Sequence, residues 1–181
     1  LQVFDQYLPN NQPNQINPVN PKEQSVVIKE NDLLDLGDIK KITLNGIKAN
    51  ISAGIRYLAA WLNGNGCVPL NHKMEDAATA EISRCQLWQW NKHGAKVYET
   101  QEIINQPFLT KLCLEEAHLI QTTLCDNNIQ KYQDEKYALA YDLFVQMIFN
   151  EILDEFMTTV AYPYIIEKAT PNVIQQQASR L

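Results

Sequence analysis

The chain has 181 residues, of which 45% are hydrophobic and 20% are charged, as is ordinary for a globular protein. Fifteen Lys and Arg residues against 21 Asp and Glu residues give a net charge of −6, which disfavours nucleic acid and anionic membranes as partners. No apolar run approaches the roughly 18 residues that a membrane-spanning helix needs. The length allows one substantial core, so we expect one domain, with two small ones as the alternative.

The first part of the chain, residues 1–31, is predicted to be irregular. The stretch PNNQPNQINPVNPKEQ holds four Pro and five Asn residues, which resist both helix and strand. Composition alone favours a disordered linker here. The first residues lack the basic start and the apolar core of a signal peptide. The chain opens with Leu rather than Met, which we interpret as the mark of a processed, excised or truncated product.

The remainder, residues 32–181, is predicted to be a helical domain. Apolar residues recur there at steps of three and four, which is the period of an amphipathic helix. No β alternation persists and no internal repeat is visible, so the predicted fold class is all-α, a bundle of about five helices. The expected ranges are 43–62 (ended by Gly64-Asn65-Gly66), 75–93, 110–124, 134–150 and 151–162, with residues 67–72 as a short connection.

The Cys and His residues give no sign of a metal site. The Cys residues form no CxxC pair, and the three His residues do not fall at the spacing of zinc ligands. We therefore expect reduced thiols in an intracellular protein. The four Cys residues are Cys67, Cys85, Cys113 and Cys125.

The most specific feature is the segment GIRYLAAWLNGNGCVPLNHKMEDAATAEISRCQLWQW, residues 54–90. Its core is GNGCVP, followed in register by MEDAATAEISR and a Trp-x-Trp helix face. The segment resembles the C-terminal helical domain of malate synthases of the shorter, A-type class. The start of the chain agrees, because Val3-Phe4-Asp5, Pro9 and Pro13-Asn14-Gln15 are similar to the family's VFDxxxPxPNQ stretch, with two extra residues between the prolines.

This resemblance implies an enzyme of the glyoxylate cycle that condenses acetyl-CoA, glyoxylate and water to malate and CoA with the help of Mg²⁺. The family builds its active site on a β/α barrel, which carries the metal ligands and a catalytic arginine, and the C-terminal helical domain caps that barrel. Nothing in this sequence matches the alternating strands and helices of a barrel. The implied partners are therefore acetyl-CoA, glyoxylate and the barrel domain of the same enzyme, and this chain alone is expected to be inactive.

Asp76 is the catalytic residue that the resemblance implies, as general base and then proton donor. Removing a proton from the methyl group of a thioester is difficult for a carboxylate whose ordinary pKa is about 3.9, so the developing enolate must be stabilised at the same moment. The predicted helix start at Asp76 favours a negative charge there. Without the resemblance, Glu75 and Asp76 would be interpreted as acids that cap a helix.

Several other residues are candidates for smaller roles. The resemblance places Pro9, Pro13, Asn14 and Gln15 beside the acetyl-CoA pocket. Cys67 lies in the loop before Asp76, either near the path of the CoA thiol or as an inert small apolar residue. Two residues are candidates for support: Glu75, by holding the loop or as a solvated cap, and Arg84, by pairing with Glu81 or by anchoring the domain to the barrel.

The chain ends in Ser179-Arg180-Leu181, a conservative variant of the Ser-Lys-Leu address that a peroxisomal import receptor reads at a free C-terminus. In an enzyme of the glyoxylate cycle this tripeptide predicts a peroxisomal or glyoxysomal location, with the cytoplasm as the alternative.

Two other functions compete with malate synthase. The chain could be a non-catalytic helical interaction module that kept the family's core and lost the barrel, or a different CoA-ester lyase or synthase, which would lack this helical motif. The sequence upstream of Leu1 discriminates the first of these from the enzyme, because only the enzyme requires a barrel there.

Overall fold

The computed structural model describes residues 29–34 and 41–166. Residues 1–40 and 41–181 form separate units, so each is described by itself. In the first unit the described residues form one short helix, α2 (Glu30–Leu34). The irregular segment predicted for residues 1–31 lies almost wholly outside the described residues, and its boundary at residue 31 stays a prediction.

Helix α3 (Leu44–Leu62) confirms the first predicted helix. The Thr43 hydroxyl accepts a hydrogen bond from the amide of Gly46 at 3.1 Å, which satisfies one of the free donors of the first turn. One face of the helix is fully buried, and Gly64 follows the helix in a left-handed conformation with φ +88. The buried face includes Ile47, Ile51, Ile55 and Leu58.

A β-hairpin follows α3, where a short connection and a helix start were expected. Strand β1 (Cys67–Leu70) pairs antiparallel with β2 (Lys73–Asp76). Asn71 and His72 form the turn with φ of 48° and 64°, and two central residues of positive φ give the twist that a two-residue hairpin needs. The predicted helix over residues 75–93 is confirmed as α4 (Ala77–Lys92). It starts two residues later than predicted, because Glu75 and Asp76 belong to β2.

Helix α5 (Gln106–Thr123) begins earlier than the predicted residue 110. The Asn105 side chain caps it by accepting from the amide of Phe108 at 3.0 Å. Pro107 lies in the first turn, where backbone N–H groups have no acceptor within the helix, so the lack of an N–H on proline costs no hydrogen bond. The helix therefore includes this proline, which lies three residues before the predicted start.

The fourth predicted helix, residues 134–150, is confirmed as α7 (Tyr137–Phe149), which starts three residues later than predicted. The short helix α6 (Ile129–Asp134) precedes it, and Lys136 between them is left-handed with φ 63°. A left-handed residue cannot continue an α-helix, so the chain changes direction there.

The fifth predicted helix, residues 151–162, was wrong over its first half. Only α8 (Met157–Ala161) is helical in that range as a named element, and residues 150–156 form an irregular connection. The carbonyls of Asn150, Glu151 and Asp154 accept hydrogen bonds from side chains of α4, so they are not used in a helix of their own.

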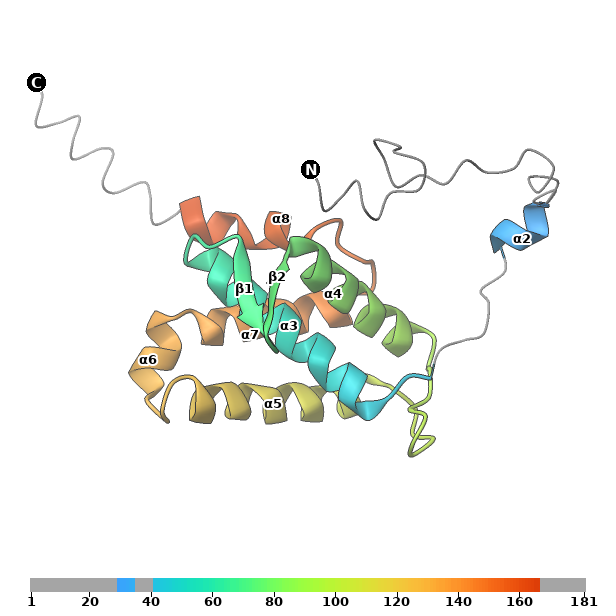
Figure 1. Cartoon of the computed structure of the whole chain (residues 1–181), viewed down its shortest axis with the longest axis horizontal. Helices are drawn as coiled ribbons and strands as arrows, with labels where there is room; N and C mark the ends of the chain where they lie inside the picture. The colour runs from blue at the N-terminus through green and yellow to red at the C-terminus, as the bar shows by residue number, and fades with distance from the viewer. Residues whose placement is uncertain (1–28, 35–40, 167–181) are drawn as a thin grey trace, which may run out of the picture. The chain divides into compact units, whose positions relative to one another are not determined.

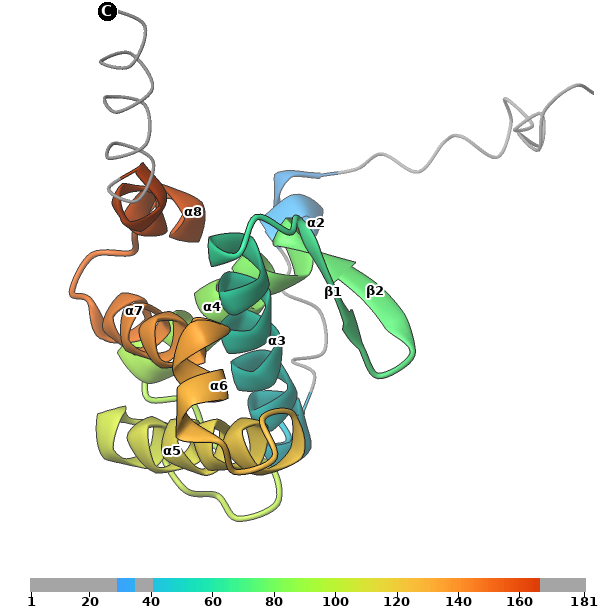
Figure 2. The ribbon, with the colours of Figure 1, turned by 90° about the vertical axis from the view of Figure 1, so that its left-hand side faces the viewer.

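Helix α3 lies at the centre of the second unit and packs against α4, α5 and α7 (Figure 1). The hairpin projects from the helical body, which Figure 2 shows from the side. Apart from this hairpin, no named strand occurs in the described ranges, so the all-α prediction is confirmed and no β/α barrel is present there. No helix within residues 29–34 and 41–166 combines the length and the apolar character that crossing a membrane would require.

Candidate active site

The hairpin places four side chains on one exposed face. In its register Cys67 lies opposite Asp76, and Pro69 lies opposite Met74. Directly opposed residues share a face, with Cβ atoms about 4.5–5.5 Å apart. All four side chains are exposed, whereas Val68 and Leu70 alternate with them and are buried. We call the set Cys67, Pro69, Met74 and Asp76 the outer hairpin face.

Asp76 is both the last residue of β2 and the N-cap of α4. Its Oδ1 atom accepts a hydrogen bond from the amide of Ala78 at 2.9 Å. The other oxygen, Oδ2, makes no hydrogen bond within the described residues. The cap therefore fixes the direction of the carboxylate, on a residue that is exposed.

Glu75 lies on the opposite face of the hairpin and is half-buried. Its Oε2 atom accepts from the Thr79 hydroxyl at 2.6 Å, a bond between β2 and the first turn of α4. Two roles were predicted for Glu75, and this hydrogen bond agrees with the one in which Glu75 holds the segment around Asp76.

Arg84 is one of the most buried side chains, with 1% of its surface exposed. Its Nε atom donates to Glu81 Oε2 at 2.9 Å, which is the pairing expected as one of its two alternatives. Its Nη2 atom donates to the carbonyl of Asp154 at 2.9 Å. Arg84 therefore links α4 to the connection before α8.

Two neighbouring residues of α3 approach the hairpin, and the sequence pattern predicted no role for either of them. Arg56 Nη2 donates to the carbonyl of Pro69 at 3.0 Å, so α3 holds β1 directly. Tyr57 is almost fully buried, and burial first, then the negative charges of Asp76 and Glu81, raise its pKa above the ordinary 10.0. The tyrosine thus stays neutral beside the candidate base. Both residues fall within the segment that resembles malate synthases, which is the signal that would have singled them out.

Cys67 borders a hollow of about 300 Å³ between α3, the hairpin and the start of α7. Arg56, Asn65 and Tyr137 also line it. This hollow adjoins the outer hairpin face, because Cys67 and Pro69 belong to both.

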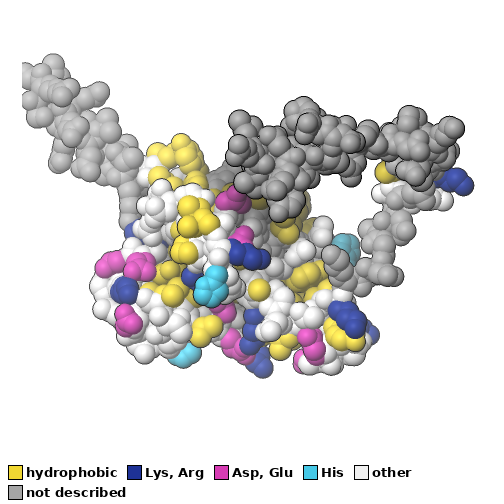
Figure 3. Space-filling view, viewed as in Figure 1, with side chains coloured by type: hydrophobic (Ala, Val, Ile, Leu, Met, Phe, Trp, Pro, Cys, Tyr) yellow, Lys and Arg dark blue, Asp and Glu magenta, His cyan; other side chains and the backbone are white. Residues whose placement is uncertain are grey.

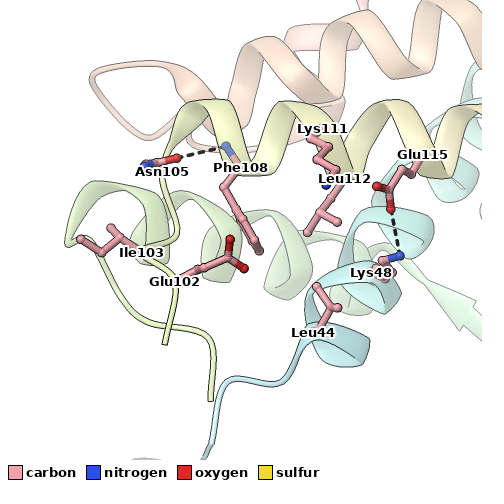
Figure 4. Close-up of a pocket in the computed structure, with 9 residues that line it drawn as sticks. All are labelled: Leu44, Lys48, Glu102, Ile103, Asn105, Phe108, Lys111, Leu112 and Glu115. Atoms are coloured by element: carbon pink, nitrogen blue, oxygen red, sulfur yellow. Dashed lines mark hydrogen bonds and ion pairs between the residues drawn. The ribbon is translucent and has the colours of Figure 1, made fainter. Parts of the chain in front are cut away.

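A larger hollow, of about 540 Å³, lies between α3 and α5 (Figure 4). Its charged lining includes Lys48 and Glu115, which pair at 2.9 Å, together with Lys111 and Glu102. None of the predicted site residues lines it, so volume alone does not identify the candidate site. Basic and acidic side chains are also interspersed over the face seen in Figure 3, which shows no field of a single sign.

Some predicted features cannot be placed. Pro9, Pro13, Asn14, Gln15 and the C-terminal Ser179-Arg180-Leu181 lie outside the described residues. Within the part of the chain that is described, no group of three or more His, Cys, Asp or Glu side chains is arranged to hold a metal ion.

The family model "Malate synthase, C-terminal" matches residues 41–165, which is the whole helical unit around Asp76. The chain belongs to this family. The resemblance carried by residues 54–90 is therefore confirmed, and the malate synthase match continues through α5, α7 and α8.

Individual malate synthases agree with the family match. The chain is 40% identical to "Malate synthase, glyoxysomal" of Candida tropicalis over 90% of this chain and 28% of that protein. It is 36% identical to the glyoxysomal malate synthase of Glycine max over 92% of this chain and 29% of that protein. It is 37% identical to "Malate synthase" of Dictyostelium discoideum over 75% of this chain and 24% of that protein. The chain thus spans less than a third of the length of these relatives.

Proposed function

We propose that this chain is the part of a malate synthase that supplies the general base, Asp76, for condensing acetyl-CoA with glyoxylate and water to malate and CoA. The observation that carries the proposal is the state of the Asp76 carboxylate. Asp76 is exposed on the outer hairpin face, one of its oxygens is fixed by the cap of α4, and the other has no hydrogen-bond partner among the described residues.

In the proposed reaction, the free oxygen of Asp76 takes a proton from the methyl group of acetyl-CoA. The resulting enolate carbon bonds to the aldehyde carbon of glyoxylate, and the aldehyde oxygen becomes the malate hydroxyl by taking a proton back from Asp76. Water then cleaves the thioester C–S bond, its hydroxyl going to the acyl carbon and a proton to the sulfur, to give malate and free CoA. A weak base suffices only where the enolate oxygen is stabilised at the same time, which is a large catalytic term in such reactions. That stabilisation is assigned to the barrel arginine of the family, outside this chain.

The family also implies Mg²⁺, but the described residues do not fit it, because they form no cluster of metal-binding side chains. We therefore assign no step of this chain to the metal, whose ligands are expected in the barrel. For the same reason we propose that the 181-residue chain alone releases no CoA from acetyl-CoA and glyoxylate.

The acetyl-CoA side of the site is proposed to include Cys67, which lies directly opposite Asp76, and the loop residues Pro9, Pro13, Asn14 and Gln15. The support for Cys67 is its place on the outer hairpin face. It is exposed, so a substrate chain can pass over it towards the base.

The deciding experiment replaces Asp76 by Asn in the full-length enzyme. Asn keeps the size of the side chain and its oxygen can still cap α4, but it cannot accept the methyl proton. We expect kcat to fall about a hundredfold to ten-thousandfold, with the glyoxylate affinity and the melting temperature nearly unchanged.

The matched control is Asp142→Asn, which makes the same chemical change at an exposed residue of α7 that is given no part in the proposed site. It should keep most of the activity. If Asp76→Asn retains more than half of the wild-type kcat, the base lies elsewhere, and the non-catalytic interaction module becomes the better account of this chain.

We further propose a peroxisomal or glyoxysomal location. Two of the relatives described above carry the word glyoxysomal in their names, and the tripeptide Ser179-Arg180-Leu181 is of the kind that the import receptor reads.

A further inference from the structure

One face of α4 is bonded to the main chain of the connection that precedes α8. Its members lie at helical spacing and reach residues 150–157. Trp88 Nε1 donates to the carbonyl of Asn150 at 2.8 Å, and Lys92 Nζ donates to that of Glu151 at 3.0 Å. We call this face the α4 ladder, and it consists of Glu81, Arg84, Trp88 and Lys92.

Glu81 and Arg84 form the end of the ladder that is nearer to Asp76. Arg84 donates through Nε to Glu81 and through Nη2 to the carbonyl of Asp154, both at 2.9 Å. Glu81 uses its other oxygen, Oε1, to accept from the amide of Met157 at 2.7 Å. Two side chains of α4 thus hold both the connection and the first residue of α8.

A gain in folding stability does not explain why α4 carries the Glu81–Arg84 ion pair. Arg84 Nη1 is buried and has no partner among the described residues, and an unsatisfied buried donor lowers stability. An apolar side chain of similar volume fills such a place without that loss, and replacing a buried ion pair in this way is often neutral or stabilising. What the pair supplies, and an apolar contact does not, is a fixed direction and register between two elements.

The register of α4 determines where Asp76 lies. Asp76 is the N-cap of α4, five residues before Glu81 and eight before Arg84, on a regular helix of 16 residues. A rotation or shift of α4 against the 150–157 connection therefore moves the carboxylate with it. A general base must lie within about 3 Å of the proton it takes, and misplacement by about 1 Å can cost a hundredfold in rate.

We propose that Glu81 and Arg84 are a positioning pair, which sets the register of α4 and thereby aims the Asp76 carboxylate at the substrate methyl group. The inference rests on the proposed role of Asp76 as the base. Neither residue is proposed to touch the substrate, since Arg84 is buried and Glu81 is turned towards Met157.

The test uses the full-length enzyme with two conservative variants, Arg84→Lys and Glu81→Gln. Lys keeps the charge but cannot donate in two fixed directions, and Gln keeps the shape but presents an amide to Arg84 in place of a carboxylate oxygen. The matched control is Lys92→Gln, which removes one bond at the far end of the same ladder. For each protein, kcat, both KM values, the melting temperature and the kinetic isotope effect with acetyl-CoA deuterated at the methyl group are measured.

We expect kcat per folded molecule to fall about tenfold to a hundredfold in both variants, with both KM values within about twofold of wild type. The isotope effect should be at least as large as in wild type, because proton abstraction becomes slower. Loss of folded protein alone lowers the amount of active enzyme but leaves the isotope effect and the kcat of the folded fraction unchanged.

Three results would overturn the positioning role: an unchanged kcat per folded molecule in both variants, a loss carried by KM, or an isotope effect that falls towards unity. A loss in Lys92→Gln as large as in Arg84→Lys would also contradict it, because the whole connection rather than the pair would then matter. Should Arg84→Lys fail to fold, Glu81→Gln decides. Asp76→Asn is measured beside them, and its full activity would reject the proposed base rather than the pair alone.

Discussion

Asp76 is an exposed residue at the junction of β2 and α4, and one of its carboxylate oxygens caps the helix. The sequence predicted its place at a helix start, and α4 does begin at the next residue. It did not predict that Cys67 lies directly across a hairpin from it. The turn residues Asn71 and His72 adopt positive φ without being the Asn-Gly or Asp-Gly pair that usually marks such a turn. The sequence therefore did not indicate the hairpin.

The cysteines differ in a way that only the folded chain reveals. Cys113 is fully buried, and burial first, then the charge of Glu116, raise the pKa of its thiol from 9.0 to about 12. Cys67 is exposed. At pH 8 we therefore expect iodoacetamide to modify Cys67 in the native chain and to leave Cys113 intact, as read by peptide mass spectrometry.

The same shift predicts how stability depends on pH. The native state keeps the Cys113 proton that the unfolded chain releases above pH 9, so this stabilising contribution is complete below pH 9 and is lost as the pH rises towards 12.

In the iodoacetamide experiment, modification of Cys113 at pH 8 as fast as that of Cys67 would show that the α5 region opens readily.

Among the elements, α3 was predicted almost to the residue, because its apolar stripe is continuous and Thr43 caps it. The irregular connection of residues 150–156 was not, because its carbonyls accept hydrogen bonds from α4 side chains that lie 59 to 70 positions earlier in the chain. The break at Lys136 was also missed, since Lys has no local preference for the left-handed conformation it adopts. Periodicity reports the face that a helix buries, but not bonds made to distant main chain.

Helices α3 and α7 pack closely at Gly54 because glycine has no Cβ atom. A Cβ atom added at Gly54 would overlap the ring of Phe144, which is fully buried on α7. Gly to Ala in a helix interior normally stabilises by about 0.5–1 kcal/mol, but here overpacking should outweigh that gain. We expect Gly54→Ala to lower the free energy of unfolding by about 1–3 kcal/mol in urea titrations.

A double-mutant cycle with Phe144→Leu checks the cause. If the clash is responsible, the double variant should be more stable than the sum of the two single changes implies, because Leu vacates part of the space. Additive effects would mean that the two residues do not interfere.

For the whole molecule, the helical architecture and the family followed from the sequence. What the rest of such an enzyme contributes could not be predicted, because the chain spans under a third of the length of its relatives. The proposed site is correspondingly partial. It includes a carboxylate with a fixed direction as the proposed base, while the groups proposed to stabilise the enolate are assigned to the rest of the enzyme.

Location is also a property of the whole molecule. Deleting Ser179-Arg180-Leu181, or fusing a tag after Leu181, should move a fluorescently labelled full-length protein from peroxisomes to the cytoplasm, because the receptor requires a free C-terminal tripeptide. Activity in extracts should not change. Persistent punctate fluorescence after the deletion would show that another signal directs the protein.

The α4 ladder also bears on how freely this domain can change in evolution. Four side chains of α4 bind the connection before α8 almost entirely through main-chain carbonyls and one amide. Every amino acid offers the same carbonyl, and Ile152 and Phe156 in this connection are 81% and 52% exposed. The exposed side chains of Ile152 and Phe156 can therefore change in sequence while the bonds from α4 keep the path of the main chain.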